Sequence, residues 1–437
     1  MESSTGSVQV ASAASDDLLT TEASDGDDSS DGPGPTGCGD GTWDVGEECD
    51  DGNQTNADGC NADCQLSGTL LWHDSVGSGF NLIEQAMTNV VAADGTVYVA
   101  GYSTDMAMAR DGWVGRYSAE GQSRWIRAHM GAGGGNDEVQ GLVLDGQGSL
   151  YAAGYESTPS AGVDAWIRRY DLDGAEQWTR TYDGPSSGHD VFHSVSLDAE
   201  GNIVAVGHHN VVGEAADALL RKYSPDGDVL WTRTHSGSEG GNEMIEGVAS
   251  SPAGNLYVAG HEKGSFGEGI NAWLAKYDND GNILWTRTYN GGASLNDFYT
   301  AVAVVGDDDV VVCGYEVAED YPWHVLVRRY DDRGALVWAD EYLGAAEQGA
   351  LCYGIAVDSV DDVVITGGER EGEVRRAMLR KYDPTGDVWW SQSIAVGEVG
   401  TNHGRSVAIG PNDTIAVAGG LNLGTDARDI WVGVFTP

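Results

Sequence analysis

Hydrophobic and polar residues alternate along most of the chain, and turn-forming residues interrupt the alternation at short intervals. In one representative stretch the strand-like segments are VFHSVSL (191–197), NIVAVGH (202–208), DALLRKY (217–223) and DVLWTRTH (228–235), separated by turns such as DAEG and SPDG. An apolar period of two is typical of β-strands, because successive side chains point to opposite faces of a sheet. The pattern predicts four consecutive antiparallel strands joined by tight turns.

This four-strand pattern recurs at a nearly constant interval along the chain. Its clearest marker is a tryptophan in each fourth predicted strand, and the seven copies are Trp72, Trp125, Trp178, Trp231, Trp285, Trp338 and Trp390. They are 53, 53, 53, 54, 53 and 52 residues apart, and the last six end a phrase Y-[DS]-x-x-G-x-x-x-W such as YDNDGNILW at 277–285. Four-stranded repeats of this length are typical of β-propeller blades. Because a buried tryptophan removes roughly 150–250 Å² from water, we expect each one to anchor its blade to the next.

The two ends of the repeat region predict how the propeller closes. The last repeat stops at DIWVGVF (429–435), a third strand, whereas the first begins with GTLLWHDS (68–75), a fourth strand without three before it. An open solenoid would need polar caps at both ends, but a ring closed by residues 68–75 exposes no sheet edge. The sequence therefore predicts an all-β, seven-bladed β-propeller over residues 68–437.

Two segments of the chain carry a resemblance to a known family. SPAGNLYVAG (251–260) and NAWLAKYDNDGN (271–282) closely resemble the repeat of the seven-bladed β-propeller family of bacterial surface proteins. The resemblance covers residues 76–437 and implies the propeller fold and a place at the cell surface. It implies little about activity.

The composition narrows the classes of partner. Lys and Arg number 23 against 69 Asp and Glu, which gives a formal net charge of -46. Such a chain repels nucleic acid and anionic lipid, so we expect neither as a partner. No run of about 18 apolar residues occurs, so we also expect no membrane span. We expect a monomer.

The chain begins with a segment of different composition. Residues 1–37 are mostly Ser, Thr, Asp and Gly with few large apolar side chains, which predicts a disordered acidic tether. The segment shows neither the charged start nor the apolar stretch of a signal peptide. We nevertheless expect an extracellular or outer-surface location, with the export signal not visible in this chain, because of the cysteines that follow.

Four cysteines lie within residues 38–67, namely Cys38, Cys49, Cys60 and Cys64. The pattern CGDGTWDVGEECDDGNQTNADGCNADC resembles the cysteine-rich repeat of myxobacterial surface proteins. A unit this short cannot bury a sufficient core, so we expect two disulfides, for which three pairings are possible. A Cys₄ zinc site is the alternative, although such sites usually consist of two close CxxC pairs.

The same segment is rich in carboxylates on a glycine-rich loop. Hard oxygen ligands of this kind suit Ca²⁺, and the candidate ligands are Asp40, Glu48, Asp50, Asp51 and Asp58. A solvated acidic loop without an ion is the alternative. Two further cysteines, Cys313 and Cys352, fall at strand ends that face each other in adjacent blades, where they could form a disulfide or pack as small apolar residues.

An uneven distribution of histidine suggests where a ligand would bind. Five of the ten histidines fall on one rim within blades 3 and 4, near acidic residues, and the candidate ligand-binding residues are His189, Asp190, His193, His208, His209, Glu243, His261 and Glu262. Imidazoles beside carboxylates offer ligands to a transition metal and hydrogen-bond partners to a sugar. The alternative is that each polar residue holds its own turn. His208 and His261 also occupy a repeat position that is Tyr in other blades, as at Tyr102, Tyr155 and Tyr315.

The sequence favours a non-catalytic binding or interaction platform for a protein or glycan at the cell surface. No G-x-S-x-G, P-loop, H-E-x-x-H or dinucleotide-binding fingerprint occurs in the sequence. A polysaccharide lyase or hydrolase with acid and base residues on the channel face remains an alternative, and a structural surface-layer component is a second. A pair of carboxylates facing each other across the channel would favour the hydrolase.

Overall fold

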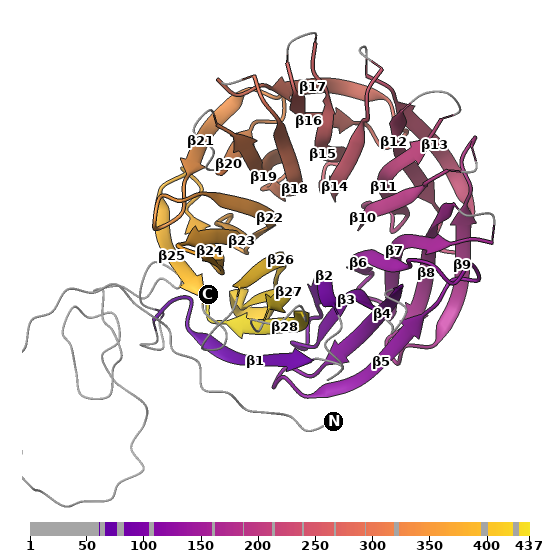
Figure 1. Ribbon diagram of the computed structural model, residues 1–437, viewed down its shortest axis with the longest axis horizontal. Coiled ribbons are helices and arrows are strands. Elements are labelled where there is room, and N and C mark those ends of the chain that lie inside the picture. Colours follow the sequence, from indigo (N-terminus) through magenta and orange to yellow (C-terminus); the bar gives the residue numbers. More distant parts are fainter. Residues whose placement is uncertain are drawn as a thin grey trace, which may run out of the picture.

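The strands form seven four-stranded antiparallel sheets arranged around a central channel (Figure 1). In this computed structural model, the described residues are Asn61, 66–76, 83–104, 109–159, 162–186, 188–211, 215–237, 240–265, 268–292, 294–318, 323–394, 401–422 and 428–437. The fold confirms the predicted seven-bladed propeller. The predicted tether, the four cysteines of the predicted cysteine-rich segment and the five candidate calcium ligands lie outside the described residues.

Each of the first six blades consists of four consecutive strands, ordered from the channel outward. Blades 1 to 3 are β2 (Glu84–Val91), β3 (Val97–Thr104), β4 (Arg110–Tyr117), β5 (Ser123–His129), β6 (Glu138–Leu144), β7 (Ser149–Ser157), β8 (Val163–Asp171), β9 (Glu176–Tyr182), β10 (Val191–Leu197), β11 (Ile203–Asn210), β12 (Ala216–Tyr223) and β13 (Val229–His235). Blades 4 to 6 are β14 (Met244–Ser250), β15 (Leu256–Lys263), β16 (Ile270–Tyr277), β17 (Ile283–Tyr289), β18 (Asp297–Val305), β19 (Asp309–Val317), β20 (Trp323–Tyr330), β21 (Leu336–Tyr342), β22 (Ala350–Val357), β23 (Val363–Glu371), β24 (Val374–Tyr382) and β25 (Val388–Ile394).

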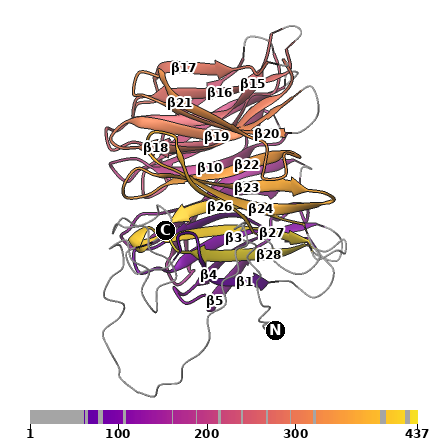
Figure 2. The same ribbon diagram turned by 90° about the vertical axis from the view of Figure 1, so that its left-hand side faces the viewer.

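The seventh blade combines both ends of the described chain. Its strands are β26 (Thr401–Ile409), β27 (Ile415–Asn422), β28 (Arg428–Phe435) and, outermost, β1 (Leu70–Val76), with the short 3-10 helix η1 (Pro411–Asp413) between β26 and β27. The edge-on view in Figure 2 shows β1 beside β28. Gly68 N donates to Pro437 O at 3.0 Å, which extends this pairing beyond the strand. The predicted closure by residues 68–75 is therefore confirmed, because β1 completes blade 7 and leaves no blade with three strands.

The turn between the third and fourth strands explains the repeated glycine. In the turn of blade 4, Gly281 has φ +79, a left-handed conformation that other residues rarely adopt. The carboxylate of Asp278 accepts hydrogen bonds from the main-chain nitrogens of Asp280 and Asn282, at 3.0 and 2.8 Å. The segment DNDGN is thus a hairpin turn closed by its own aspartate.

The repeated tryptophans join each blade to the following one, as predicted. Five of them donate an indole hydrogen bond to a main-chain oxygen in the next blade's turn, and these pairs are Trp72 with Ala119, Trp178 with Pro225, Trp231 with Asn279, Trp285 with Asp332 and Trp338 with Pro384. An arginine two residues later strengthens the contact in four blades. Arg180, for example, stacks over the Trp178 ring and donates to Gly227 O at 3.0 Å. The tryptophans are half-buried rather than buried, because they cover a turn at the surface.

The apolar core lies between the blades. Each cluster of buried side chains combines residues from neighbouring sheets, as where Val204 and Val206 of β11 pack with Ile245 of β14 and Val258 of β15. Apolar burial of this kind is the main stabilising contribution to a propeller. Within the described residues, no helix is long and apolar enough to cross a membrane.

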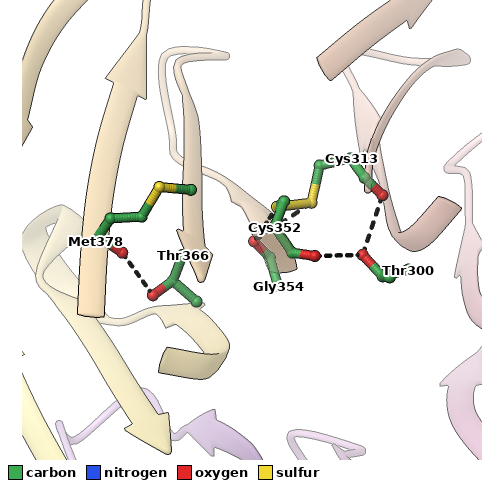
Figure 3. The surroundings of a disulfide bond; sticks show 6 residues. All are labelled: Thr300, Cys313, Cys352, Gly354, Thr366 and Met378. Atoms are coloured by element: carbon green, nitrogen blue, oxygen red, sulfur yellow. Dashed lines mark hydrogen bonds between the residues drawn. A yellow bond between two sulfur atoms is a disulfide. The ribbon is translucent and has the colours of Figure 1, made fainter. Parts of the chain in front are cut away.

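Cys313 and Cys352 form a disulfide between blades 5 and 6 (Figure 3). Their Cα atoms are 6.0 Å apart and both residues are fully buried. Thr300 lies beside the bridge and donates its hydroxyl to the carbonyl oxygens of both cysteines, at 3.2 and 2.9 Å. The disulfide that the sequence allowed is therefore present, and it cross-links the second strand of blade 5 to the innermost strand of blade 6.

Candidate functional site

Seven side chains, one from each blade, project into the central channel at the same repeat position. The innermost strand of every blade contains a β-bulge, where one residue has no partner in the register with the second strand. The seven bulge residues are Met87, Gln140, His193, Glu246, Thr300, Tyr353 and Arg405. All of them line a cavity of about 400 Å³ along the channel. A bulge re-aims a side chain, and here it turns one residue per blade toward the channel.

The next residue in each innermost strand is small. These residues are Thr88, Gly141, Ser194, Gly247, Ala301, Gly354 and Ser406. A Cβ on Gly141 would lie 3.0 Å from the main-chain nitrogen of Val195 in the next blade, and one on Gly354 would lie 3.0 Å from Cα of Ser406. Neighbouring inner strands therefore approach closely at this position, which restricts it to small residues. The bulge position just before it has no such restriction and carries seven different side chains.

One sector of the channel combines imidazoles with a carboxylate. His193 Nε2 lies 2.9 Å from His208 Nδ1, and the two oxygens of Glu246 lie 3.9 Å from His193 Nδ1 and 4.0 Å from His261 Nδ1. His261 Nδ1 is buried and makes no hydrogen bond. Burial lowers the pKa of His193 to about 4 and that of His208 to about 3, so both imidazoles are neutral near pH 7.

The facing sector, three blades further round the ring from Glu246, carries a positive charge. The Arg405 guanidinium stacks over the Tyr353 ring, 4.6 Å from its centre. No hydrogen bond or ion pair joins this guanidinium to another described residue. Its positive field adds to burial in lowering the pKa of His193. The rings of Phe298 and Tyr315 lie 5.0 Å apart at a tilt of 33° and complete an aromatic wall between the two charged sectors.

The structure separates the eight candidate residues that the sequence singled out. His193, His208 and His261 come together around Glu246. His209 and Glu262 instead belong to a repeated contact between blades, in which the last residue of an outer strand bonds to the second strand of the next blade. Tyr182 and His209 form this contact at 2.8 Å, and His235 and Glu262 form it at 3.1 Å.

The remaining three candidates lie in the loops that precede the innermost strands. The buried carboxylate of Asp190 accepts hydrogen bonds from the main-chain nitrogens of Gly184 and Asn210, at 2.6 and 3.2 Å. Glu243 accepts one from Lys263 N at 3.4 Å, and His189 is exposed. Burial raises the pKa values of Asp190 and Glu243. These two carboxylates order the loops at the blade entrance.

Sequence reasoning missed Glu246, Arg405 and Tyr353. The signal was present, because Met87 follows Trp72 by 15 residues and Arg405 follows Trp390 by the same 15 residues. Aligning the seven repeats on their tryptophans therefore places all seven bulge residues in one column, followed by a column of small residues. Clustering of histidines does not reveal this column, because only one of its seven members is histidine.

Comparison with known proteins adds the following. No family model matches the sequence. The curated regulatory protein FlaEY of Caulobacter vibrioides is 23% identical over 411 residues, and the alignment covers 82% of this chain. It covers 38% of FlaEY, so the chain spans well under half the length of that relative.

Three solved structures resemble this chain at low sequence identity. The β-propeller domain of the trilobed protease from Pyrococcus furiosus has a TM-score of 0.48 and 9% identity, over 80% of this chain and 92% of that one. Drosophila Plexin A in complex with Semaphorin 1b has a TM-score of 0.49 and 9% identity, over 84% of this chain and 87% of that one. A protein of unknown function from Dyadobacter fermentans has a TM-score of 0.47 and 11% identity, over 85% of this chain and 98% of that one. Likeness at this level concerns the fold alone.

Proposed function

We propose that the protein is a non-catalytic binding module at the outer cell surface, and that its central channel binds the end of an acidic glycan. The observation that carries this proposal is the column of seven bulge residues. The scaffold repeats from blade to blade, yet the position that faces the channel carries a different side chain in every blade. A repeated scaffold with one diversified, inward-facing position is suited to recognising one asymmetric ligand.

The charge of the channel favours a ligand with a carboxylate. Arg405 is held on Tyr353 with its nitrogen donors directed to no other described residue, although acidic residues outnumber basic ones threefold in the chain. A planar guanidinium can bind a carboxylate through two parallel hydrogen bonds. A uronic acid provides such a group.

The other lining residues suit the rest of a sugar. Tyr353, Tyr315 and Phe298 present aromatic surface that can pack on the apolar face of a pyranose ring. Glu246 and the neutral His193 can accept or donate hydrogen bonds to hydroxyl groups. Aromatic surface that lies beside several convergent polar groups suits a sugar, which has an apolar ring face and hydroxyl groups at its edge.

The buried disulfide supports a location outside the cytoplasm. Disulfides such as that between Cys313 and Cys352 persist in oxidising compartments and are rare in reducing ones. The strongly acidic composition and the resemblance to surface-protein repeats agree with a tethered, soluble module. The relative FlaEY is described as a regulatory protein, which is compatible with a binding role.

A two-carboxylate glycosidase is the less favoured alternative. Such an enzyme needs a second acid facing the first across the scissile bond. Glu246 is the one carboxylate among the seven bulge residues. We therefore favour binding over hydrolysis.

Calorimetric titration of the full chain tests the proposal. The ligands are an oligouronide and the same oligosaccharide with its carboxyl groups reduced to alcohols. We expect the oligouronide to bind at least 10-fold more tightly, and Arg405→Gln to remove that difference. Arg124→Gln, an exposed charge change on β5, serves as the matched control and should bind like the parent. Equal binding of both ligands, binding of neither, or unchanged binding by Arg405→Gln would contradict the acidic-glycan assignment.

A further inference from the structure

Blade 5 departs from the repeat at two positions that lie next to each other in space. Blades 2, 4, 5 and 6 each carry a glutamate in the second strand. This glutamate accepts a hydrogen bond from the last residue of the preceding blade's fourth strand. In blade 5 the glutamate is Glu316, which accepts from Tyr289 Oη at 2.8 Å. In blades 4 and 6 a hydroxyl from the blade's own fourth strand also donates to this carboxylate. In blade 4, Thr288 donates to Glu262 at 3.0 Å, and in blade 6 Ser393 donates to Glu369.

In blade 5 the equivalent of Thr288 and Ser393 is Glu341. The hydroxyl donor is therefore replaced by a second carboxylate that faces Glu316. Carboxylate oxygens of Glu316 and Glu341 lie within 4.8 Å of each other, and two carboxylates this close repel each other unless a cation or a proton lies between them. The substitution removes a hydrogen bond and adds like charge, which is unfavourable unless something positive is bound there.

The second departure supplies an imidazole at the same place. The residue opposite the second-strand position is Asp164 in blade 2, Asp217 in blade 3 and Asn271 in blade 4, but it is His324 opposite Glu316 in blade 5. His324 Nδ1 lies 3.4 Å from Glu316 Oε1. Ligand atoms of Glu316, His324 and Glu341 all lie within 4.8 Å of one another.

We propose that Glu316, His324 and Glu341 form a binding site for a divalent transition-metal ion, for which Zn²⁺ is the best fit. Zinc binds imidazole nitrogen and carboxylate oxygen at about 2.0–2.2 Å, so two ligand atoms on one ion are about 3.4 Å apart. Glu341 is exposed and its side chain can rotate to close the remaining distance, whereas Glu316 is buried and fixed by Tyr289.

The ligand set selects the kind of ion. Calcium and magnesium prefer sites made only of oxygen atoms, whereas a histidine nitrogen favours ions such as zinc. Zinc usually takes four ligands, so three protein ligands leave at least one position for water. Water can reach this position because His324 is half-buried and Glu341 is exposed. None of the three residues lines the channel, so the site is separate from the proposed glycan site and does not depend on it.

The repeat itself provides the variants that test this site. Glu341→Thr and His324→Asn restore the residues that blade 4 carries at Thr288 and Asn271, so both proteins should fold. His235→Tyr is the matched control, because it removes the His235–Glu262 pair, in which no second carboxylate takes part, and restores the tyrosine found at Tyr182 and Tyr289. Each change is made in the full chain, so that any other metal-binding groups are common to all four proteins.

Zinc bound after equilibrium dialysis is measured by elemental analysis, and the visible spectrum of Co²⁺ serves as a second probe. We expect the parent and His235→Tyr to bind one more equivalent than Glu341→Thr and His324→Asn. Zinc should raise the melting temperature of the parent more than that of Glu341→Thr, because only the parent gains ligand-linked stability at this site. In EDTA, Glu341→Thr should melt at or above the temperature of the parent. Equal zinc content in the parent and Glu341→Thr, or an equal effect of Ca²⁺ at this site, would overturn the proposal.

Discussion

His193 Nε2 lies 2.9 Å from His208 Nδ1, at the point where the channel wall of blade 3 meets its second strand. One ring is the bulge residue that faces the cavity, and the other occupies the repeat position that is tyrosine in blades 1, 2 and 5. Burial holds both imidazoles neutral near pH 7, so protonating either of them in acid should destabilise the folded protein around the channel.

This pair predicts a loss of stability in acid. The pKa of His193 is lowered to about 4 and that of His208 to about 3, from an ordinary value of 6.5. Between pH 6.5 and these values the unfolded chain binds more protons than the folded one, so stability is full above pH 6.5 and falls as the pH decreases. His208→Tyr should therefore lose less melting temperature between pH 7 and pH 4.5 than the parent loses.

The control for acid stability is His189→Gln, which changes an exposed histidine in the same blade. Asp297 works in the opposite direction, because burial raises its pKa to about 6, but it is present in all three proteins and does not affect their comparison. An identical acid loss in the parent and in His208→Tyr would show that the pair is not held neutral.

The same substitution of tryptophan by phenylalanine should reduce stability by different amounts at Trp285 and at Trp125. Trp285 Nε1 donates to Asp332 O at 3.0 Å, whereas Trp125 Nε1 is buried without a hydrogen-bond partner. Trp285→Phe should reduce stability by about 1 kcal/mol more than Trp125→Phe, since only the first loses a hydrogen bond. The midpoints of urea unfolding of the two variants measure this difference in stability. A larger loss of stability for Trp125→Phe than for Trp285→Phe would contradict the prediction.

Ring closure predicts that β1 stabilises the whole propeller. A chain that begins at residue 77 lacks β1 and leaves the edge of β28 unpaired, whereas a chain that begins at residue 66 keeps the pairing from Leu70 to Val76. We expect the shorter chain to melt at least several degrees lower, as a loss of 1 kcal/mol already shifts a domain of 150–250 residues by about 2–4 °C. Melting within 2 °C of the longer chain would mean that closure contributes little.

The buried disulfide predicts resistance to reduction. Cys313 and Cys352 are fully buried, so a thiol reagent can attack the bond only after local or global opening. Mass spectrometry should find the bridge intact after dithiothreitol treatment of the folded protein and broken after treatment in denaturant. Replacing both residues with alanine should reduce stability by about 2–4 kcal/mol. Free thiols in protein purified under non-reducing conditions would contradict the assignment.

Much of the fold could be predicted because the sequence repeats. The spacing of the tryptophans fixes the number of blades, and the split repeat at residues 68–75 and 429–435 fixes the closure. The partial exposure of the tryptophans could not be predicted in this way, since Trp178 covers a turn that belongs to a different blade. The period-two pattern of a strand shows which of its residues lie on the same face of the sheet. It does not show which residues of the next blade pack against that face.

The candidate site could be predicted only in part for a similar reason. His193 and His261 were found because histidine is rare, but their shared neighbour Glu246 is one glutamate among many acids. Its role depends on the β-bulge between Ile245 and Gly247, which turns it into the channel. A bulge is a local change of register, which the period-two pattern of a single strand does not show; it becomes visible only when the seven repeats are aligned on their tryptophans.

A steric block of the channel tests the central claim most directly. Met87 is the bulge residue of blade 1, next to Arg405 of blade 7 and three blades from Glu246, so Met87→Trp would fill the cavity without removing a polar contact. Arg124→Trp places the same ring on the outside of the same blade as a control. In calorimetric titration with the oligouronide, the account predicts loss of binding for Met87→Trp and unchanged binding for Arg124→Trp. Full affinity in the Met87→Trp protein would contradict the account, because the ligand would then bind outside the channel.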